Sequence, residues 1–307
     1  MDRLQFLKLM GIGGAVFATG LPGFPAILTG SSPGGFYFVQ LSDIHWGFEG
    51  PKANPDPGGT MRLAIEAVNA LNPQPDFIVF TGDLTHTTDD PQVRRQRMTE
   101  FKAQIARLRT QRIHFLPGEH DASLDHGEAF HEFFGPSQYA FEHRGLQCLC
   151  LDNVSQEGSI LGETQIRWLK GELARLPKDR PLVIFAHRPL FPLYPDWDWT
   201  TTDGDQALEL LDKHPFVTVF YGHIHQEHHH QTGHIQHHAA TSLIFPLPPP
   251  GGAPKRAPVP WDTEHPYKGL GFRQVEAHLP GKAGKTPGYE IEEEGLAKSA
   301  PFAEQHA

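Results

Sequence analysis

Short runs rich in Val, Ile, Leu and Phe alternate along this chain with longer segments whose apolar residues recur at helical spacing. Short apolar runs bounded by polar or turn-forming residues are typical of buried β-strands. We expect strands at Phe36–Ser42, Phe77–Thr81, Ile113–Leu116, Leu146–Leu151, Leu182–Ala186 and Val217–Tyr221. Strands interleaved with helices predict a layered α/β domain, in which functional side chains gather at the carboxyl ends of the strands.

Helices and turns complete a single-domain organisation. The helical segments are Thr60–Asn72, Gln92–Thr110 and Glu163–Leu176. After Phe245 the chain continues as a Pro- and Gly-rich loop, residues 246–268, and then as a hairpin, residues 269–295. A length of 307 residues is enough for one sizeable core. We therefore predict one domain over residues 36–295, followed by a tail over residues 296–307.

The first 35 residues have the features of an export signal and a linker. Arg3 and Lys8 precede the apolar, glycine-containing stretch Leu9–Ile27, as the charged and apolar regions of a signal peptide do. Residues 3–8 resemble a twin-arginine motif whose second arginine is replaced by leucine. This region predicts an exported protein, periplasmic or extracellular, that contacts a membrane only if the signal stays uncleaved. An ordinary buried first helix is the alternative, and the glycines disfavour it.

Charge and histidine content limit the partners of the chain. The net charge is -10 at pH 7, which argues against a nucleic-acid duplex because phosphate backbones are bound by clustered Lys and Arg. The 20 histidines, against 4 methionines and 2 cysteines, favour metal chemistry, since imidazole binds ions such as zinc and iron at neutral pH. We interpret Cys148 and Cys150, two positions apart in an apolar run, as buried thiols.

Potential metal ligands follow five of the predicted strands. The residues are Asp43 and His45, Asp83, Glu119 with His120 and Asp121, His187, and His223 with His225. Each cluster alone is weak evidence, because a single His after a strand is more often a hydrogen-bonded turn residue. Five such clusters are unlikely to follow successive strands by coincidence. In order, they are Asp-x-His, Gly-Asp, Gly-x-His-Asp, His and Gly-His-x-His. The pattern therefore predicts a metal centre.

The order and spacing of these motifs resemble the calcineurin-like metallophosphoesterases, from about Phe36 to the last hairpin and including Gly162–Leu169. The resemblance implies a four-layer α/β/β/α fold, a two-sheet β-sandwich flanked by helices, with two metal ions (Mn, Fe or Zn) at one edge. It also implies that one metal is bound by Asp43, His45, Asp83 and His225. The other would be bound by Asp83, Glu119, His187 and His223. His120 occupies the family's position for protonating the leaving group.

Physical chemistry supports these roles. Two divalent ions about 3.5 to 4 Å apart need a bridging carboxylate, and they lower the pKa of a bridging water enough to give a hydroxide near pH 7. Asp83 is the candidate bridge because it ends an interior strand directly after Gly82, which permits close backbone approach. Phosphoryl transfer also needs a proton for the leaving oxygen. We therefore predict hydrolysis of a phosphate mono- or diester by a metal-bridging hydroxide, with His120 as general acid.

Two positions depart from the family pattern. Glu119 stands where the family usually has Asn and would add a third carboxylate, which favours tighter metal binding or a more highly charged ion. The alternative is that Glu119 turns away from a weak second site. His86 follows Asp83 by three residues, and either His86 or Asp121 is a candidate to orient His120.

Several other features have two interpretations. The tract His228–His238 is a metal-collecting surface or a polar hairpin, and we favour the hairpin because alternate strand residues face opposite sides. Arg188 contacts either the substrate phosphate or a surface carboxylate. For the tryptophans we favour anchoring of loops over stacking on substrate; they are Trp197, Trp199 and Trp261.

The loops contain no recognisable substrate code. The substrate is predicted only as a small phosphate ester, and the oligomeric state is left open. A non-catalytic metal-binding or scaffold protein that retains the fold is the alternative function.

Overall fold

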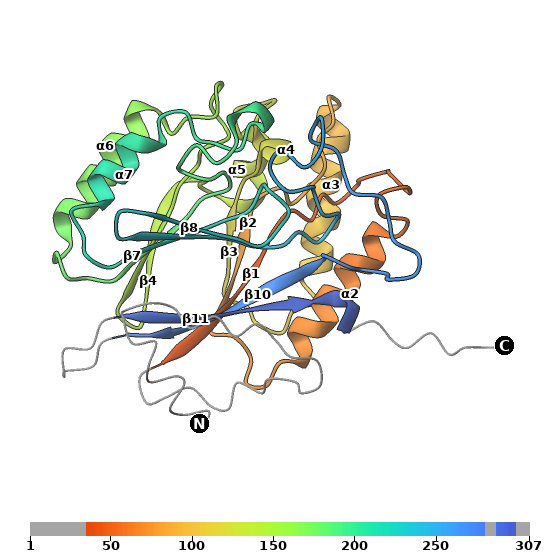
Figure 1. Ribbon diagram of the computed structural model, residues 1–307, viewed down its shortest axis with the longest axis horizontal. Coiled ribbons are helices and arrows are strands. Elements are labelled where there is room, and N and C mark those ends of the chain that lie inside the picture. The colour runs from red at the N-terminus through yellow and green to blue at the C-terminus, as the bar shows by residue number, and fades with distance from the viewer. Residues whose placement is uncertain (1–34, 280–286, 299–307) are drawn as a thin grey trace.

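Two β-sheets form the centre of the computed structural model, which describes residues 35–279 and 287–298 (Figure 1). The first sheet has the order β11-β10-β1-β2-β3. Its strands are β1 (Phe36–Leu41), β2 (Phe77–Thr81), β3 (Ile113–Leu116), β10 (Gly271–His278) and β11 (Gly288–Gly295). The second sheet has the order β4-β5-β6-β7-β9-β8. Its strands are β4 (Tyr139–His143), β5 (Leu146–Cys150), β6 (Leu182–Phe185), β7 (Val217–Tyr221), β8 (His228–Thr232) and β9 (Ile235–Ala239).

Helices cover the outer face of each sheet. The helices of the described ranges are α2 (Pro57–Ala70), α3 (Pro91–Ile105), α4 (Glu119–Ala122), α5 (Glu128–Phe134), α6 (Gly162–Arg175), α7 (Gly204–Leu211) and the 3₁₀ turns η1 (Pro195–Trp197) and η2 (Leu296–Lys298). Figure 1 shows α6 and α7 on one side of the sheets and α2 and α3 on the other. This arrangement confirms the predicted four-layer α/β/β/α fold. None of the helices in the described ranges combines the length and hydrophobicity needed to cross a bilayer.

The layer between the sheets is rich in phenylalanine. Phe38 on β1 stacks on Phe77 of β2 at a ring-centroid distance of 4.8 Å and meets Phe220 of β7 edge to face at 5.5 Å. Parallel strands that are covered on both faces need apolar residues on both, which explains their nearly continuous apolar sequences. Cys148 and Cys150 also lie in this layer as free, buried thiols, as predicted.

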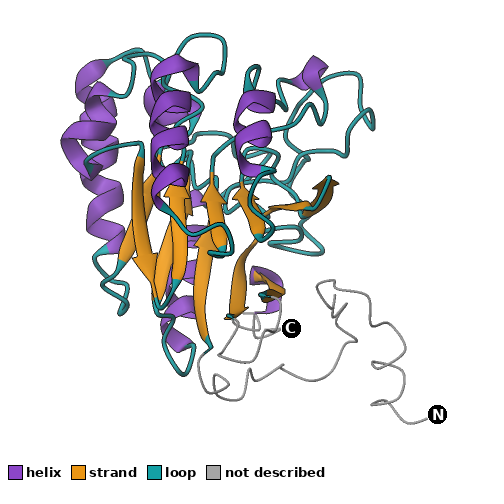
Figure 2. Ribbon diagram, turned by 90° about the vertical axis from the view of Figure 1, so that its left-hand side faces the viewer, coloured by secondary structure: helices purple, strands orange, loops and turns teal. Residues whose placement is uncertain are grey.

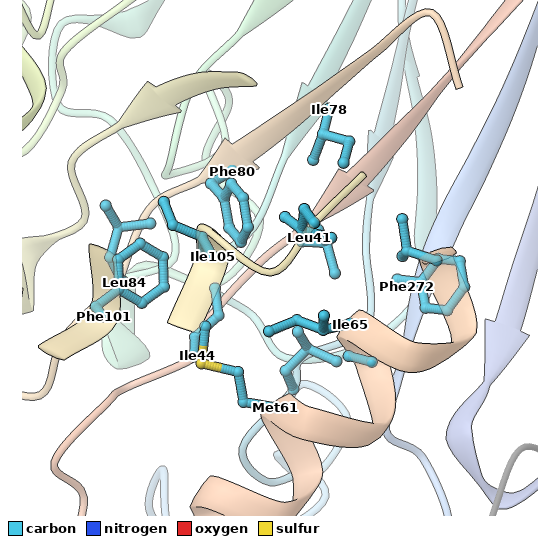
Figure 3. Close-up of a cluster of buried hydrophobic side chains, with 14 of the residues drawn as sticks. Leu41, Ile44, Met61, Ile65, Ile78, Phe80, Leu84, Phe101, Ile105 and Phe272 are labelled. Carbon is cyan, nitrogen blue, oxygen red and sulfur yellow. The ribbon is translucent and has the colours of Figure 1, made fainter. Parts of the chain in front are cut away.

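A second core joins the first sheet to its helices. Met61 and Ile65 of α2 point toward Leu41 of β1, while Phe101 and Ile105 of α3 lie near Phe80 and Leu84 (Figure 3). All these side chains are less than one-tenth exposed. The apolar stripes of both helices therefore hold the sheet whose strand ends carry Asp43 and Asp83.

Helix boundaries differ from the predicted ones where capping residues act. α2 begins at Pro57 rather than Thr60, because the Asp56 side chain accepts a hydrogen bond from the Gly59 N–H at 2.8 Å. α3 likewise begins after Asp90, whose side chain accepts from the Gln92 N–H at 2.8 Å. Asp followed by Pro is a helix-start signal, since Asp caps free N–H groups and Pro has none. α3 also ends at Ile105, five residues before the predicted end at Thr110.

The chain termini fall largely outside the described ranges. Of the predicted export signal and linker, residues 1–35, only Gly35 is described, and the predicted tail is described only to residue 298. The first tail residues are ordered parts of the domain: Leu296 is fully buried, and its N–H donates to the Leu270 carbonyl at 2.9 Å.

The histidine-rich tract is a β-hairpin, as favoured from the sequence. β8 and β9 pair antiparallel around Gly233, with His230 opposite His237 and His229 opposite His238. His237 is fully buried, whereas His230 is exposed and stacks on Phe191 at 3.9 Å. Opposite residues share a face, so His230 and His237, whose rings are 5.7 Å apart, lie on one face of the hairpin, and His229 and His238, whose Nδ1 atoms are 2.6 Å apart, lie on the other.

Candidate metal centre

The predicted ligands lie on segments that directly follow β1, β2, β3, β6 and β7. Figure 2 shows the loops gathered at one end of the strands. Among the described residues, five groups of side chains have ligand atoms within 4.8 Å of one another, and two of these groups contain all the predicted ligands. The first contains Asp43, His45, Asp83 and His225, and the second contains Glu119, His187 and His223. All seven predicted ligand residues are thus brought together in two neighbouring groups.

The backbone around these residues has an uncommon conformation. Five of them have positive φ angles: Asp43 (54°), His45 (48°), Asp83 (50°), His223 (67°) and His225 (53°). Non-glycine residues rarely adopt this left-handed region, and such residues cluster at functional sites. Hydrogen bonds between loops hold it in place, because the N–H groups of Ile44 and His45 both donate to the Asp83 carbonyl, at 2.9 and 2.8 Å.

Three glycines allow these loops to approach one another. A Cβ atom on Gly82 would lie 2.3 Å from His187 Nδ1, and one on Gly118 would lie 2.2 Å from the Asp83 nitrogen. A Cβ atom on Gly222 would lie 2.0 Å from Ser42 Oγ. Each glycine precedes a predicted ligand, so the Gly-Asp, Gly-Glu and Gly-His pairs in the sequence have a steric reason.

The first group presents acceptor atoms to a common point. His225 Nδ1 donates to the Phe245 carbonyl at 2.8 Å, which leaves a lone pair on Nε2. That Nε2 lies 3.3 Å from His45 Nε2 and 3.4 Å from Asp43 Oδ1. Asp83 Oδ2 is 3.3 Å from His45 Nε2. A cation is therefore the natural occupant of this point.

The second group is arranged in the same way. His187 Nδ1 donates to the Thr81 carbonyl at 2.7 Å, so Nε2 carries a lone pair, and it lies 2.8 Å from Glu119 Oε2. His223 Nδ1 is 3.0 Å from Glu119 Oε1. Glu119 thus faces His187 and His223 rather than turning away. Asp83 Oδ2 is also 3.6 Å from His187 Nε2, so one carboxylate oxygen lies near both groups.

Protonation states of most ligands in the site suit metal binding. The exception is His187, because burial, which lowers its pKa, is outweighed by Asp83 and Glu119, which raise it well above the usual value, so this ring must lose a proton to bind a metal. Burial alone would raise the pKa of Asp43, but His225, His187 and the Ser42 hydroxyl hold it below its usual value. Burial also opposes ionisation of Glu119, yet His223, Arg188 and His187 bring its pKa well below the usual range. Burial, reinforced by His120 and His225, lowers the pKa of His45. Ionised carboxylates and neutral imidazoles are the forms that bind metals.

His120 lies at the border of the site, with its side chain 23% exposed. Its Nδ1 accepts a hydrogen bond from the Thr87 N–H at 3.1 Å, and its Nε2 lies 4.0 Å from Asp83 Oδ2. His86 stacks on the ring at 4.8 Å, and His86 Nδ1 contacts His45 Nδ1 at 3.2 Å.

Of the two candidates to orient His120, His86 stacks on its ring, whereas the Asp121 carboxylate binds other groups. This carboxylate accepts from the backbone N–H groups of Leu84, Thr85 and Gly118, at 2.8 to 2.9 Å, and from the Thr85 hydroxyl. Asp121 therefore fixes the loop after β2, while a main-chain group orients His120. A main-chain donor leaves no signal in the sequence.

Of the two interpretations of Arg188, the structure shows the ion pair with an exposed carboxylate, since the Asp198 side chain is 53% exposed, although Arg188 itself is buried. It is 4% exposed, donates from Nη1 to the Asp198 carbonyl at 2.8 Å and forms an ion pair with the Asp198 carboxylate. Its Nη2 lies 3.7 Å from Glu119 Oε2. The arginine therefore contributes positive charge beside the second ligand group.

The tryptophans anchor loops, as favoured from the sequence. Trp197 and Trp199 are 7% and 0% exposed and pack edge to face at 5.2 Å. The Trp261 ring packs on Tyr267, also at 5.2 Å, and the main-chain N–H of Trp261 donates to the Lys52 carbonyl at 2.7 Å.

Sequence reasoning missed Asp198 and Arg256 at this site. The Asp198 carbonyl lies 3.1 Å from His223 Nε2, and Arg256 Nη1 lies 3.4 Å from the same nitrogen. Both residues belong to irregular loops, where neither periodicity nor a motif distinguishes a functional side chain from a solvated one.

Comparisons with known proteins give consistent results. The family model described as calcineurin-like phosphoesterase matches residues 36–227. The mouse serine/threonine-protein phosphatase CPPED1 is 29% identical over 220 residues, 63% of this chain and 70% of the relative. A probable cyclic nucleotide phosphodiesterase from Rhodopseudomonas palustris is 26% identical over 213 residues, 62% of this chain and 71% of the relative.

Solved structures with the same fold have different roles. A dimetal phosphatase from Danio rerio aligns with a TM-score of 0.55 and 14% identity, covering 85% of this chain and 96% of the other. GAP50, an anchor in the inner membrane complex of Plasmodium, aligns with a TM-score of 0.57 and 13% identity, covering 87% of each chain. The fold therefore occurs both in a phosphatase and in an anchoring protein.

Proposed function

The chain belongs to the calcineurin-like phosphoesterase family, and we propose that it hydrolyses a small phosphate mono- or diester at the two neighbouring ligand groups. Family membership places it among the metal-dependent phosphoric ester hydrolases. The two curated relatives are named for different substrates, a phosphoprotein phosphatase and a cyclic nucleotide phosphodiesterase. The choice between a monoester and a diester is therefore a matter for substrate assays.

One observation carries the proposal: acceptor atoms face each other without donors between them. When His187 is neutral, with its proton on Nδ1 for the Thr81 carbonyl, its Nε2 and the buried Glu119 Oε2 lie 2.8 Å apart with no hydrogen between them and no other hydrogen-bond partner among the described residues. Buried polar atoms normally have partners, because leaving one unsatisfied costs about 1–3 kcal/mol. Imidazole nitrogen with carboxylate oxygen is a donor set that suits Mn, Fe or Zn. The residues present thus fit metal ions.

We assign the two groups to two ions. Asp43, His45 and His225 would hold one, Glu119, His187 and His223 the other, and Asp83 would bridge them. Bound ions would supply an activated water as nucleophile and would neutralise the phosphate oxygens. Thr81 and Phe245 support this assignment, because their carbonyls fix His187 and His225 with Nε2 toward the centre.

His120 would deliver the proton to the leaving oxygen. The Thr87 N–H donates to Nδ1, so the neutral ring carries its proton on Nε2, which lies 4.0 Å from Asp83 Oδ2. As general acid the ring would be the imidazolium, with Nδ1–H turned away from the Thr87 N–H, and it would give up the Nε2 proton. Partial exposure of the ring gives a substrate access to this proton. A general acid must lie within hydrogen-bond reach of the leaving oxygen, and a site at the border of the centre meets that requirement.

The structural likeness to an anchoring protein makes a scaffold the second candidate. A scaffold has no need of a proton donor beside the metal ligands. The ligand set with His120 fixed next to it favours hydrolysis.

The experiment uses purified protein loaded with Mn²⁺ or Fe²⁺ and an aryl phosphate monoester and diester as substrates. We expect turnover that Asp83→Asn reduces to the level of buffer, because the variant weakens both ligand groups. Asp179→Asn, in the exposed turn before β6, is the matched control and should retain turnover. Inert wild-type protein across metals would favour the scaffold, and an active Asp83→Asn variant would contradict the assignment.

We also propose that the protein acts after export, on the strength of the charged and apolar pattern of residues 1–27. Fractionation of cells that express the full chain tests this location, and recovery in the cytosol alone would contradict it.

A further inference from the structure

A pocket of about 430 Å³ lies between η1 and the Pro- and Gly-rich loop. Its lining residues are Tyr194, Asp196, Trp197, Asp198, Pro254, Lys255 and Arg256. A volume of this size is in the range of small-molecule sites, which lie at about 300–1,000 Å³.

The pocket shares a wall with the second ligand group. The Asp198 carbonyl lies 3.1 Å from His223 Nε2 and accepts from Arg188 Nη1 at 2.8 Å. Arg256 Nη1 lies 3.4 Å from His223 Nε2 and donates to the Trp197 carbonyl at 3.2 Å. A phosphate ester bound at the metal centre would therefore have this pocket beside it.

The cations of the pocket are unneutralised. Within the described part of the chain, neither Lys255 nor Arg256 has a carboxylate within the 4.0 Å of an ion pair, whereas Arg188 pairs with Asp198. Asp196 is then the one pocket acid without an arginine partner. With the Arg188–Asp198 pair counted as neutral, the two cations Lys255 and Arg256 face one acid, Asp196, which leaves a net positive charge of one at the pocket of a chain whose net charge is -10.

The tautomer of His223 increases the availability of Arg256. With Nδ1 directed at Glu119 as a ligand, the proton of His223 is on Nε2, which donates to the Asp198 carbonyl. A nitrogen that donates cannot also accept from Arg256. The guanidinium then keeps only the Trp197 carbonyl, and its remaining N–H groups are free for an anion.

We propose that this pocket binds the part of the substrate beyond the scissile phosphate and that Arg256, assisted by Lys255, binds an anionic group there. The inference rests on the proposed function and narrows it. The preferred substrate is a small phosphate ester with a second negative charge, such as a carboxylate or a further phosphate.

The test compares two aryl phosphates that differ only in a para carboxylate or a para carboxamide. We expect wild-type kcat/KM to favour the carboxylate by about tenfold, as for a charge-assisted hydrogen bond. Arg256→Gln should reduce this ratio to near one. Arg175→Gln, exposed at the end of α6, removes the same charge and should leave the ratio unchanged. Comparing ratios between variants cancels the difference in leaving-group acidity.

An unchanged ratio in Arg256→Gln would overturn the inference while leaving the proposed function intact. If wild-type protein cleaves neither ester, the proposed function fails. Calorimetric titration of wild type and Arg256→Gln with both esters then tests whether the pocket binds the anionic group. Tighter binding of the carboxylate that is lost in Arg256→Gln supports it. Equal binding of the two esters overturns it.

Discussion

Gly118→Ala is the substitution that tests the geometry of the centre most directly. Gly118 has a φ of -103°, which alanine adopts freely, so backbone strain plays no part. The new Cβ would lie 2.2 Å from the Asp83 nitrogen and 2.1 Å from Asp83 Oδ1, where ordinary contact begins at 3.4 Å. Asp83 or Gly118 must therefore move by about 1.2 Å.

This displacement affects stability and metal binding differently. Overpacking of a tight site costs about 1–3 kcal/mol of unfolding free energy, which a domain of this size tolerates. Metal–ligand distances tolerate only about 0.2 Å, so a shift of Asp83 should remove most metal binding and turnover. Gly118→Ala should thus remain folded but largely metal-free.

Urea unfolding and metal analysis of the dialysed protein measure the two effects. Gly171→Ala is the matched control, since its Cβ meets nothing within 4 Å in α6. Alanine in a helix interior should raise its stability by about 0.5–1 kcal/mol and leave the metal content unchanged. Full metal content and turnover in Gly118→Ala would refute the close packing of Gly118 against Asp83.

Three further predictions concern the frame of the site. Burial, with His230 and His228, lowers the pKa of His237 to about 3. Below about pH 6.5 the unfolded chain therefore binds a proton that the folded chain does not, and the unfolding free energy falls as the pH drops. In urea titrations between pH 6 and 4, His237→Leu should reduce the slope of the unfolding free energy against pH by about 1.4 kcal/mol per pH unit. An unchanged slope would show that His237 is protonated in the folded protein. Phe185→Ala, in the layer between the sheets, should lower the unfolding free energy by about 3–5 kcal/mol, and a loss below about 1 kcal/mol would contradict its tight packing. Asp203→Ala removes the carboxylate that accepts from the N–H groups of Leu161 and Gly162, both at 2.8 Å. Calorimetry should show that the unfolding free energy falls by about 3 kcal/mol. An unchanged melting temperature would mean that water replaces the carboxylate.

Strands were predictable because their signal is local. β2, β3 and β7 have the predicted bounds, and the ligands follow the strands directly, so their order along the chain already indicated a shared edge. Pairing across long distances left no such signal. β10 pairs antiparallel with β1, more than 200 residues earlier, and no local pattern specifies this partner.

Shorter elements were missed for identifiable reasons. α7 has only eight residues, and β4 has alternating exposed residues at the edge of its sheet. At the site, the sequence motifs identified the ligand side chains, but they did not identify the main-chain atoms that orient those side chains. The Thr87 N–H and the Phe245 carbonyl orient His120 and His225, and any residue type at those positions supplies the same atoms.

The left-handed turns at Asp43, His45, Asp83, His223 and His225 separate the frame of the centre from its chemistry. Loop-to-loop main-chain bonds such as Ile44 N–H to the Asp83 carbonyl define the path of the chain, and they do not depend on which side chain is attached. Position 119 lies on the short helix α4. An amino-acid substitution there can therefore change the charge beside a bound ion without changing the course of the main chain. We therefore expect single substitutions at position 119 to alter which metal ion binds while the main-chain frame stays the same.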